Sequence, residues 1–142
     1  MLTTSIKTTS KIIPLEFGFY APGVCNIGPA EIARRRNVGH LGLTLTLVIL
    51  AIALIGGAPA WTRLIVTLTV AGAASGYLQA YYHFCAGFGS RGLYNFGPLG
   101  QTESVVDPDS VAADRARSRR IGVAALAIGL AFGLAAFALP LA

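Results

Sequence analysis

The chain has 142 residues, of which 54% are hydrophobic and 12% are charged, and its formal net charge is +5. A soluble domain usually carries about 25% charged residues, so this composition excludes an ordinary soluble globular protein. The apolar residues form three long runs, which is typical of membrane spans, and two cysteines are too few for a disulfide framework. We therefore predict an all-α membrane protein with three transmembrane helices.

Residues 1–38 are predicted to form a cytoplasmic or interfacial segment. The segment begins with Thr and Ser, and prolines and glycines interrupt its aromatic part, so it cannot cross a membrane as a helix. Its end predicts a short basic surface helix, because Pro29 suits a first helical position and Arg34, Arg35 and Arg36 suit the negative end of the helix dipole. Gly39 is expected to end this helix in a left-handed conformation.

Residues 39–83 are predicted to form a transmembrane helical hairpin. Its spans are roughly 40–59 and 62–82, and about twenty residues at about 1.5 Å each match a hydrocarbon core of about 30 Å. The connection around Trp61 is very short. The two helices must therefore be antiparallel neighbours.

The rest of the chain divides into a loop and a long helix. Residues 84–107 are rich in Gly and aromatic residues and predict a cytoplasmic loop. Residues 108–142 predict an amphipathic helix that continues into the third span, with Asp107 as its cap and Pro108 at its first position. No helix breaker precedes Gly122, so we expect one rod.

The basic residues predict the orientation in the membrane. Of eleven Lys and Arg residues, only Arg63 lies in the hairpin turn, and the others precede the first span or separate the second from the third. An excess of Lys and Arg marks the cytoplasmic side. We expect a multi-pass protein of the plasma (inner) membrane, with a cytoplasmic N-terminus, an external C-terminus and Gly-, Pro- and aromatic-rich cytoplasmic flanks. The same placement explains the net charge without a nucleic-acid partner.

Four possible metal ligands, Cys25, His40, His83 and Cys85, are predicted to lie on one membrane face. Two thiols and two imidazoles can bind zinc or a softer metal. Alternatively, the cysteines form a redox-active thiol pair, or they are small buried residues accompanied by interfacial histidines. Structural zinc sites usually contain closely spaced ligand pairs, and here only His83 and Cys85 are close in sequence. We therefore predict no cofactor, while a metal ion stays an alternative.

A short repeat links two distant segments of the chain. Residues 25–29 and 94–98 both contain Asn, an apolar residue, Gly and Pro in that order. The segments are either a matched pair of loops that frame one site or two ordinary turns, since Gly-Pro is a common turn signal. We favour the two ordinary turns.

The predicted spans contain small residues that suit close helix packing. Two Gly-x-x-x-Gly motifs allow helix backbones to approach closely, and they consist of Gly72 and Gly76, and of Gly129 and Gly133. Pumps and ion-coupled carriers normally keep an ionisable residue at membrane depth, and apart from the turn residue Arg63 the spans contain no Asp, Glu, Lys or Arg. We therefore expect neither a self-contained transporter nor an enzyme.

Residues 37–97 resemble one known family. The sequence Asn37-Val-Gly39, two short spans and Cys85 followed by a Gly-aromatic tail resemble the two-helix membrane module of bacterial inner-membrane rhodanese-type sulfurtransferases. The chain differs from that module because no Asp-Arg pair follows Asn37-Val-Gly39 and no Pro follows Cys85. The resemblance implies thiol or sulfur chemistry at Cys85.

The function that we expect is that of a small non-catalytic accessory or structural subunit of a larger membrane complex, such as a bacterial energy-converting complex. Its partners would be other integral-membrane subunits or further copies of the chain, together with the lipid bilayer. The alternative is a membrane protein that uses its Cys and His residues for redox, sulfur or metal handling. The expected docking residues are aromatic: Phe17, Phe19, Tyr20, Phe84, Phe88, Tyr94 and Phe96.

Overall fold

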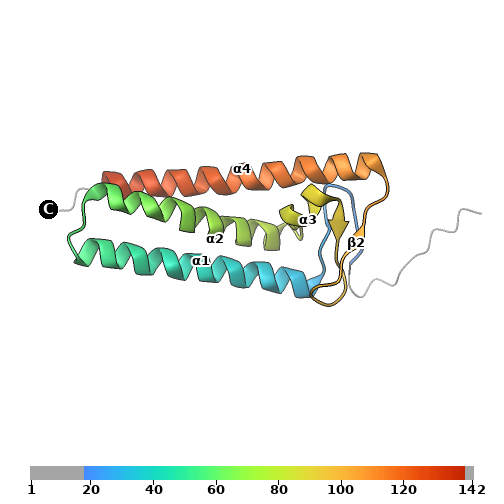
Figure 1. Ribbon diagram of the computed structural model, residues 1–142, viewed down its shortest axis with the longest axis horizontal. Helices are drawn as coiled ribbons and strands as arrows, with labels where there is room; N and C mark the ends of the chain where they lie inside the picture. Colours follow the sequence, from blue (N-terminus) through green and yellow to red (C-terminus); the bar gives the residue numbers. More distant parts are fainter. Residues whose placement is uncertain (1–17, 140–142) are drawn as a thin grey trace, which may run out of the picture.

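A computed structural model describes residues 18–139 and shows three long helical elements side by side (Figure 1). They are α1 (Pro29–Ile55), the 3-10 helix η1 (Ala60–Ile65) followed by α2 (Val66–Tyr81), and α4 (Pro108–Ala138). Each is long and apolar enough to cross a membrane. Helix α2 packs against both α1 and α4. The expectation of three apolar helices of spanning length in a mainly helical chain is therefore confirmed, whereas the all-α class is not strictly met, because two short strands are also present.

Helix α1 is longer than predicted. We expected a short surface helix that ends at Gly39, followed by a separate span, but α1 continues without interruption from Pro29 to Ile55. Gly39 is buried against α2, where a Cβ atom would lie 2.8 Å from the ring of Tyr77. Gly39 therefore permits a close contact between two helices and does not end one.

The hairpin turn contains the buried arginine Arg63, which is 7% exposed. Its guanidinium group donates hydrogen bonds to the carbonyl oxygens of Ala136 (3.4 Å) and Leu139 (3.0 Å). The last carbonyl groups of a helix have no partner within the helix. Arg63, a residue of η1, therefore supplies hydrogen-bond donors to two carbonyl groups at the C-terminal end of α4 and connects that end to η1.

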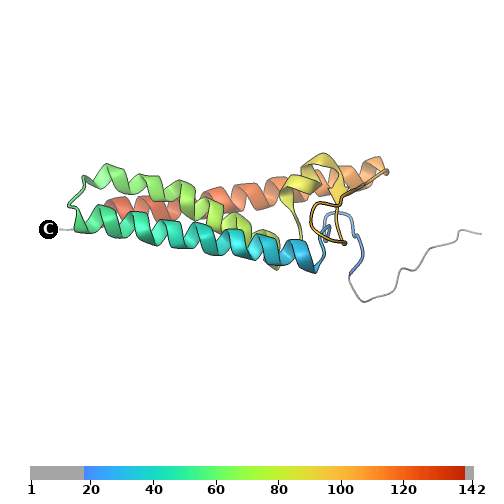
Figure 2. The same ribbon diagram turned by 60° about the horizontal axis from the view of Figure 1, so that its bottom comes forward.

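The opposite end of the helices is covered by residues 18–28 and 83–107, which we call the cap (Figures 1 and 2). The predicted loop 84–107 has structure of its own, because it contains α3 (Ala86–Arg91) and two short antiparallel strands, β1 (Leu93–Tyr94) and β2 (Glu103–Ser104). The strands pair Leu93 with Ser104 and Tyr94 with Glu103.

Helix α4 begins at Pro108, directly after the cap. The side chain of Asp107 accepts a hydrogen bond from the backbone N–H of Ser110 (2.8 Å), and this bond satisfies one unpaired N–H of the first turn. The charged first part of α4, residues 108–120, extends for about 20 Å at about 1.5 Å per residue. Every described arginine except Arg63 lies at this end of the molecule, on α1, α3 or α4.

Candidate functional site

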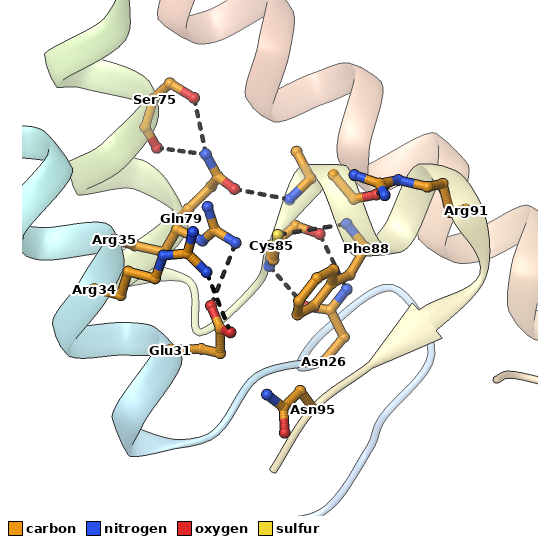
Figure 3. A network of polar contacts seen from close by, with 12 residues as sticks. Asn26, Glu31, Arg34, Arg35, Ser75, Gln79, Cys85, Phe88, Arg91 and Asn95 are labelled. Carbon is orange, nitrogen blue, oxygen red and sulfur yellow. Dashed lines mark hydrogen bonds and ion pairs between the residues drawn. The ribbon is translucent and has the colours of Figure 1, made fainter. Parts of the chain in front are cut away.

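Asn26 lies at the centre of the cap and is completely buried. Its side chain accepts a hydrogen bond from the backbone N–H of Cys85 (2.6 Å) and donates one to the carbonyl oxygen of Cys85 (3.1 Å). Figure 3 shows this pair of residues beside Phe88 at the start of α3. The two bonds join the segment before α1 to the segment after α2, across 59 residues of sequence.

The two Asn-x-Gly-Pro segments are neighbours in space. The backbone N–H of Asn95 donates to the carbonyl oxygen of Asn26 (2.9 Å), and the N–H of Gly28 donates to the carbonyl oxygen of Asn95 (2.8 Å). A Cβ atom on Gly28 would lie 2.9 Å from the Cα atom of Phe96, so only glycine permits this approach. The favoured interpretation, two ordinary turns, did not foresee this contact. The matched-loop interpretation comes closer to the observed geometry.

Gln79 connects the cap to α2. Its side-chain oxygen accepts a hydrogen bond from the N–H of Ala86 (3.0 Å), and its side-chain nitrogen donates to the hydroxyl (2.9 Å) and the carbonyl oxygen (3.1 Å) of Ser75 (Figure 3). The first N–H groups of a helix have no partner within the helix. Gln79, a residue of α2, therefore supplies the missing hydrogen-bond acceptor for the N–H of Ala86 at the start of α3.

Each outer helix carries a buried carboxylate at its cap end. Glu31 is 1% exposed and pairs with Arg35 (3.3 Å) and with Arg34 (3.8 Å), while the guanidinium of Arg35 lies over the ring of Phe88 at 5.7 Å. Because buried charges are stable only when they are paired or hydrogen-bonded, this cluster depends on all its members.

The second carboxylate, Asp114 on α4, is completely buried. It accepts hydrogen bonds from the N–H of Gly23 (2.7 Å) and from the hydroxyl of Tyr20 (3.0 Å). Burial and the neighbouring Asp114 raise the pKa of Tyr20 to about 12. Tyr20 therefore acts as a hydrogen-bond donor to Asp114 throughout the physiological pH range.

The structure does not gather the four predicted metal ligands. Within residues 18–139 no group of three or more His, Cys, Asp or Glu residues is placed to hold a metal ion. The Nδ1 atom of His40 lies 2.7 Å from the hydroxyl of Tyr77, and the sulfur of Cys85 accepts a hydrogen bond from the N–H of Phe88 (3.4 Å). The sulfur of Cys25 lies 3.8 Å from a backbone oxygen, and His83 is exposed.

The predicted docking aromatics are divided between the interior and the surface of the cap. Phe84 is fully buried, so the expectation that it contacts a partner is wrong. Phe19 is 63% exposed, whereas Tyr20 and Tyr94 stack on each other with ring centroids 5.0 Å apart. Phe88 and Phe96 are half-buried, and Phe17 lies outside the described residues. Most of these aromatics therefore build the cap itself.

Three of the four predicted packing glycines lie against a neighbouring helix. A Cβ atom on Gly76 would lie 2.5 Å from the backbone nitrogen of Gly39, and one on Gly129 would lie 2.5 Å from the backbone oxygen of Thr67. Gly133 also lies against Thr67. Gly72 faces open space and contacts no other helix.

Two neighbouring apolar cavities, both lined by Ala30, lie beside α1 next to the cap. One, of about 420 Å³, lies between the start of α1 and the loop 96–98, and the other, of about 360 Å³, lies further along α1. We call the two together the interface groove. Its lining residues are Pro29, Ala30, Ala33, Arg34, Asn37, Val38, Leu41, Phe96, Gly97, Pro98 and Leu99.

We expect both thiols to be unreactive in the folded protein. Burial raises the pKa of the Cys25 thiol, and because the thiolate is the nucleophile, Cys25 should react with iodoacetamide more slowly than a free thiol at pH 8 and faster as the pH rises. Cys85 is 1% exposed and should react only after local opening. Mass spectrometry of the alkylated chain over time measures both rates. Fast labelling of both at neutral pH would instead favour thiol chemistry.

Comparison with known proteins gives no relative. No known protein family matches the chain, and no match was found among curated proteins or solved structures. Four polar residues that organise the cap, Asn26, Gln79, Asn95 and Asp114, were not among the predicted site residues. For Asn26 and Asn95 the repeated Asn-x-Gly-Pro motif was a usable signal, whereas nothing local indicated that Gln79 or Asp114 would be buried.

Proposed function

We propose that this chain is a small non-catalytic subunit of a membrane complex and that it docks onto another integral-membrane subunit through the interface groove. One observation carries the proposal. The buried Asn26, Gln79 and Asp114 make their hydrogen bonds within the chain, while apolar side chains outside the apolar spans are left exposed. Leu99, which lines the interface groove outside the apolar spans, is 54% exposed. Such a surface suits contact with a partner better than a reaction.

The direction of the groove indicates the class of partner. The groove starts at the cap and continues along α1 to Val38 and Leu41, which are 44% and 69% exposed at the beginning of the apolar run. A partner that fills it must offer apolar groups both outside and inside the bilayer. A second integral-membrane subunit meets this requirement. The arginines at the cap end favour a cytoplasmic cap in the plasma membrane.

The scarcity of Asp, Glu, Lys and Arg among the described residues of the apolar runs supports the same proposal. Among the described residues of the three apolar runs, Arg63 carries the only charge, and it is used to hold the end of α4. Proton relays and ion pathways need ionisable groups at membrane depth. A packing role between subunits needs none.

Replacing Leu99 with glutamate should release the partner. An unpaired carboxylate placed in a desolvated contact should weaken docking by roughly tenfold or more. The measurement is native mass spectrometry of the protein extracted from its own membranes in mild detergent. Foreign subunits at fixed stoichiometry should accompany the wild-type protein and disappear with Leu99→Glu.

The matched control is Val106→Glu, because Val106 is more exposed than Leu99 and lies outside the groove. This variant should keep its partners. Extraction of the wild-type chain without a foreign subunit would contradict the proposal, and so would equal retention of partners by both variants.

A further inference from the structure

A separate cavity of about 500 Å³ lies where α1 and α2 meet near the cap. Arg36 of α1 lines it together with Tyr77, Ala80 and Tyr81 of α2 and with His83 of the following turn. None of these residues lines the interface groove. A ligand of this cavity would therefore be independent of the proposed docking partner.

The cavity lies at the boundary between the charged and apolar parts of the helices. Arg36 is one helical turn before His40, where the apolar run of α1 begins, and Tyr77 and Tyr81 belong to the last turns of α2. Tyrosine and arginine at such a boundary are typical of the level of lipid headgroups. In a membrane crossed by α1 and α2, the cavity opens at that level.

Arg36 gives the cavity a positive charge that no described carboxylate neutralises. Arg36 is exposed and forms no ion pair within residues 18–139, whereas Glu31 is engaged by Arg34 and Arg35. Asp114 accepts its hydrogen bonds from the segment 18–28. Arg36 is therefore available to a negatively charged ligand from outside this part of the chain.

The polar groups around Arg36 are held in place by the fold. The hydroxyl of Tyr77 lies 2.7 Å from Nδ1 of His40. His83 has a φ angle of 51°, which residues other than glycine rarely adopt, and its carbonyl oxygen accepts a hydrogen bond from the N–H of Asn26 (3.2 Å). Such a strained conformation persists only where the surrounding structure imposes it. The cap therefore holds His83 at the edge of the cavity.

We propose that this cavity binds the phosphate headgroup of an anionic phospholipid. Arg36 supplies the charge, and the hydroxyl of Tyr81 and the ring of His83 supply hydrogen bonds to phosphate oxygens. Basic pockets between transmembrane helices on the positively charged side commonly accept anionic headgroups. The acyl chains of the lipid extend along the apolar surfaces of α1 and α2, which a free phosphate ion could not use.

The test is native mass spectrometry of the delipidated full chain titrated with phosphatidylglycerol or with phosphatidylcholine. The wild-type chain should retain phosphatidylglycerol preferentially. Arg36→Gln should lower this retention about fivefold, the factor expected when one basic contact to an anionic lipid is lost. Arg119→Gln is the matched control, because it removes the same charge from an exposed position at the same end of the molecule and outside the cavity.

Three results would overturn the proposal. The first is equal retention of the two lipids by the wild-type chain, and the second is an equal loss in Arg36→Gln and Arg119→Gln, which would indicate general attraction by the basic end. The third is displacement of bound phosphatidylglycerol by inorganic phosphate, which would identify the cavity as a site for a free anion.

Discussion

Replacing Asn26 with alanine is expected to lower the free energy of unfolding by about 2–4 kcal/mol. The substitution leaves the backbone N–H of Cys85 without its partner in a fully buried position and removes one of the two hydrogen bonds to its carbonyl oxygen, which still accepts from the N–H of Gly89. A buried polar group left without a hydrogen bond costs about 1–3 kcal/mol and the loss of a further hydrogen bond about 0.5–1.5 kcal/mol, and water that enters the new cavity recovers part of this cost. The measurement is denaturant unfolding of the purified protein in detergent micelles.

The same variant should expose Cys85. The side chain of Asn26 connects the segment 18–28 to the start of α3, so its loss should allow that segment to open and iodoacetamide to reach the thiol. The matched control is Asn37→Ala, because Asn37 lies on the exposed surface of α1 and its replacement should change stability by less than about 0.5 kcal/mol. If both variants unfold alike and Cys85 stays protected in both, the two hydrogen bonds do not hold the cap together.

The aspartate variant separates the two hydrogen bonds of Asn26. Asn26→Asp keeps an acceptor for the N–H of Cys85 but loses the donor to its carbonyl oxygen, and a buried carboxylate would face that oxygen. An unpaired buried charge costs more than a lost neutral hydrogen bond. Asn26→Asp should therefore be at least as unstable as Asn26→Ala, although its side chain has nearly the same shape.

The apolar helices could be predicted because their signals are local. Length and hydropathy indicate the three helices that are long enough to cross a membrane. The start of α4 is equally local, since Asp107 and Pro108 are a cap and a first-turn residue that follow one another in sequence. Such signals need no knowledge of the rest of the chain.

The cap could not be predicted in the same way, because its contacts join distant segments. Asn26 and Cys85 are 59 residues apart, and Tyr20 and Asp114 are 94 residues apart. Composition also misled, since the Gly-rich aromatic segment 84–107 looked like an open loop, yet it forms α3 and a short strand pair. The repeated Asn-x-Gly-Pro motif was visible, but only the structure shows that its two copies contact each other.

The role of each glycine in a helix was also hard to predict, because it depends on distant parts of the chain. A glycine can end a helix, where its left-handed conformation is useful, or it can lie inside a helix that another backbone approaches. Gly92 does the first at the end of α3, with a φ angle of 67°, and Gly39 does the second within α1. Sequence alone does not distinguish these uses, because the difference depends on the neighbouring helix.

Replacing Gly76 with alanine should therefore destabilise the protein, whereas the same change at Gly72 should not. A Cβ atom on Gly76 would lie 2.5 Å from the backbone nitrogen of Gly39 and 2.8 Å from the backbone oxygen of Arg35, and backbone atoms cannot move aside as a flexible side chain can. Helices α1 and α2 must then separate, which should cost about 1–3 kcal/mol. Denaturant unfolding in micelles measures the difference.

Gly72→Ala is the matched control within the same motif. A Cβ atom built there would have no described atom of another part of the chain within 4 Å, so alanine should be neutral or should stabilise the helix by up to about 1 kcal/mol. The same comparison can be made in helix α4. The new Cβ atom of Gly129→Ala would meet the backbone oxygen of Thr67, whereas that of Gly122→Ala would face open space. Opposite effects within each pair would show that contact between helices, rather than helix propensity, determines the need for glycine. Equal effects at Gly72 and Gly76 would mean that α1 and α2 do not pack through Gly76.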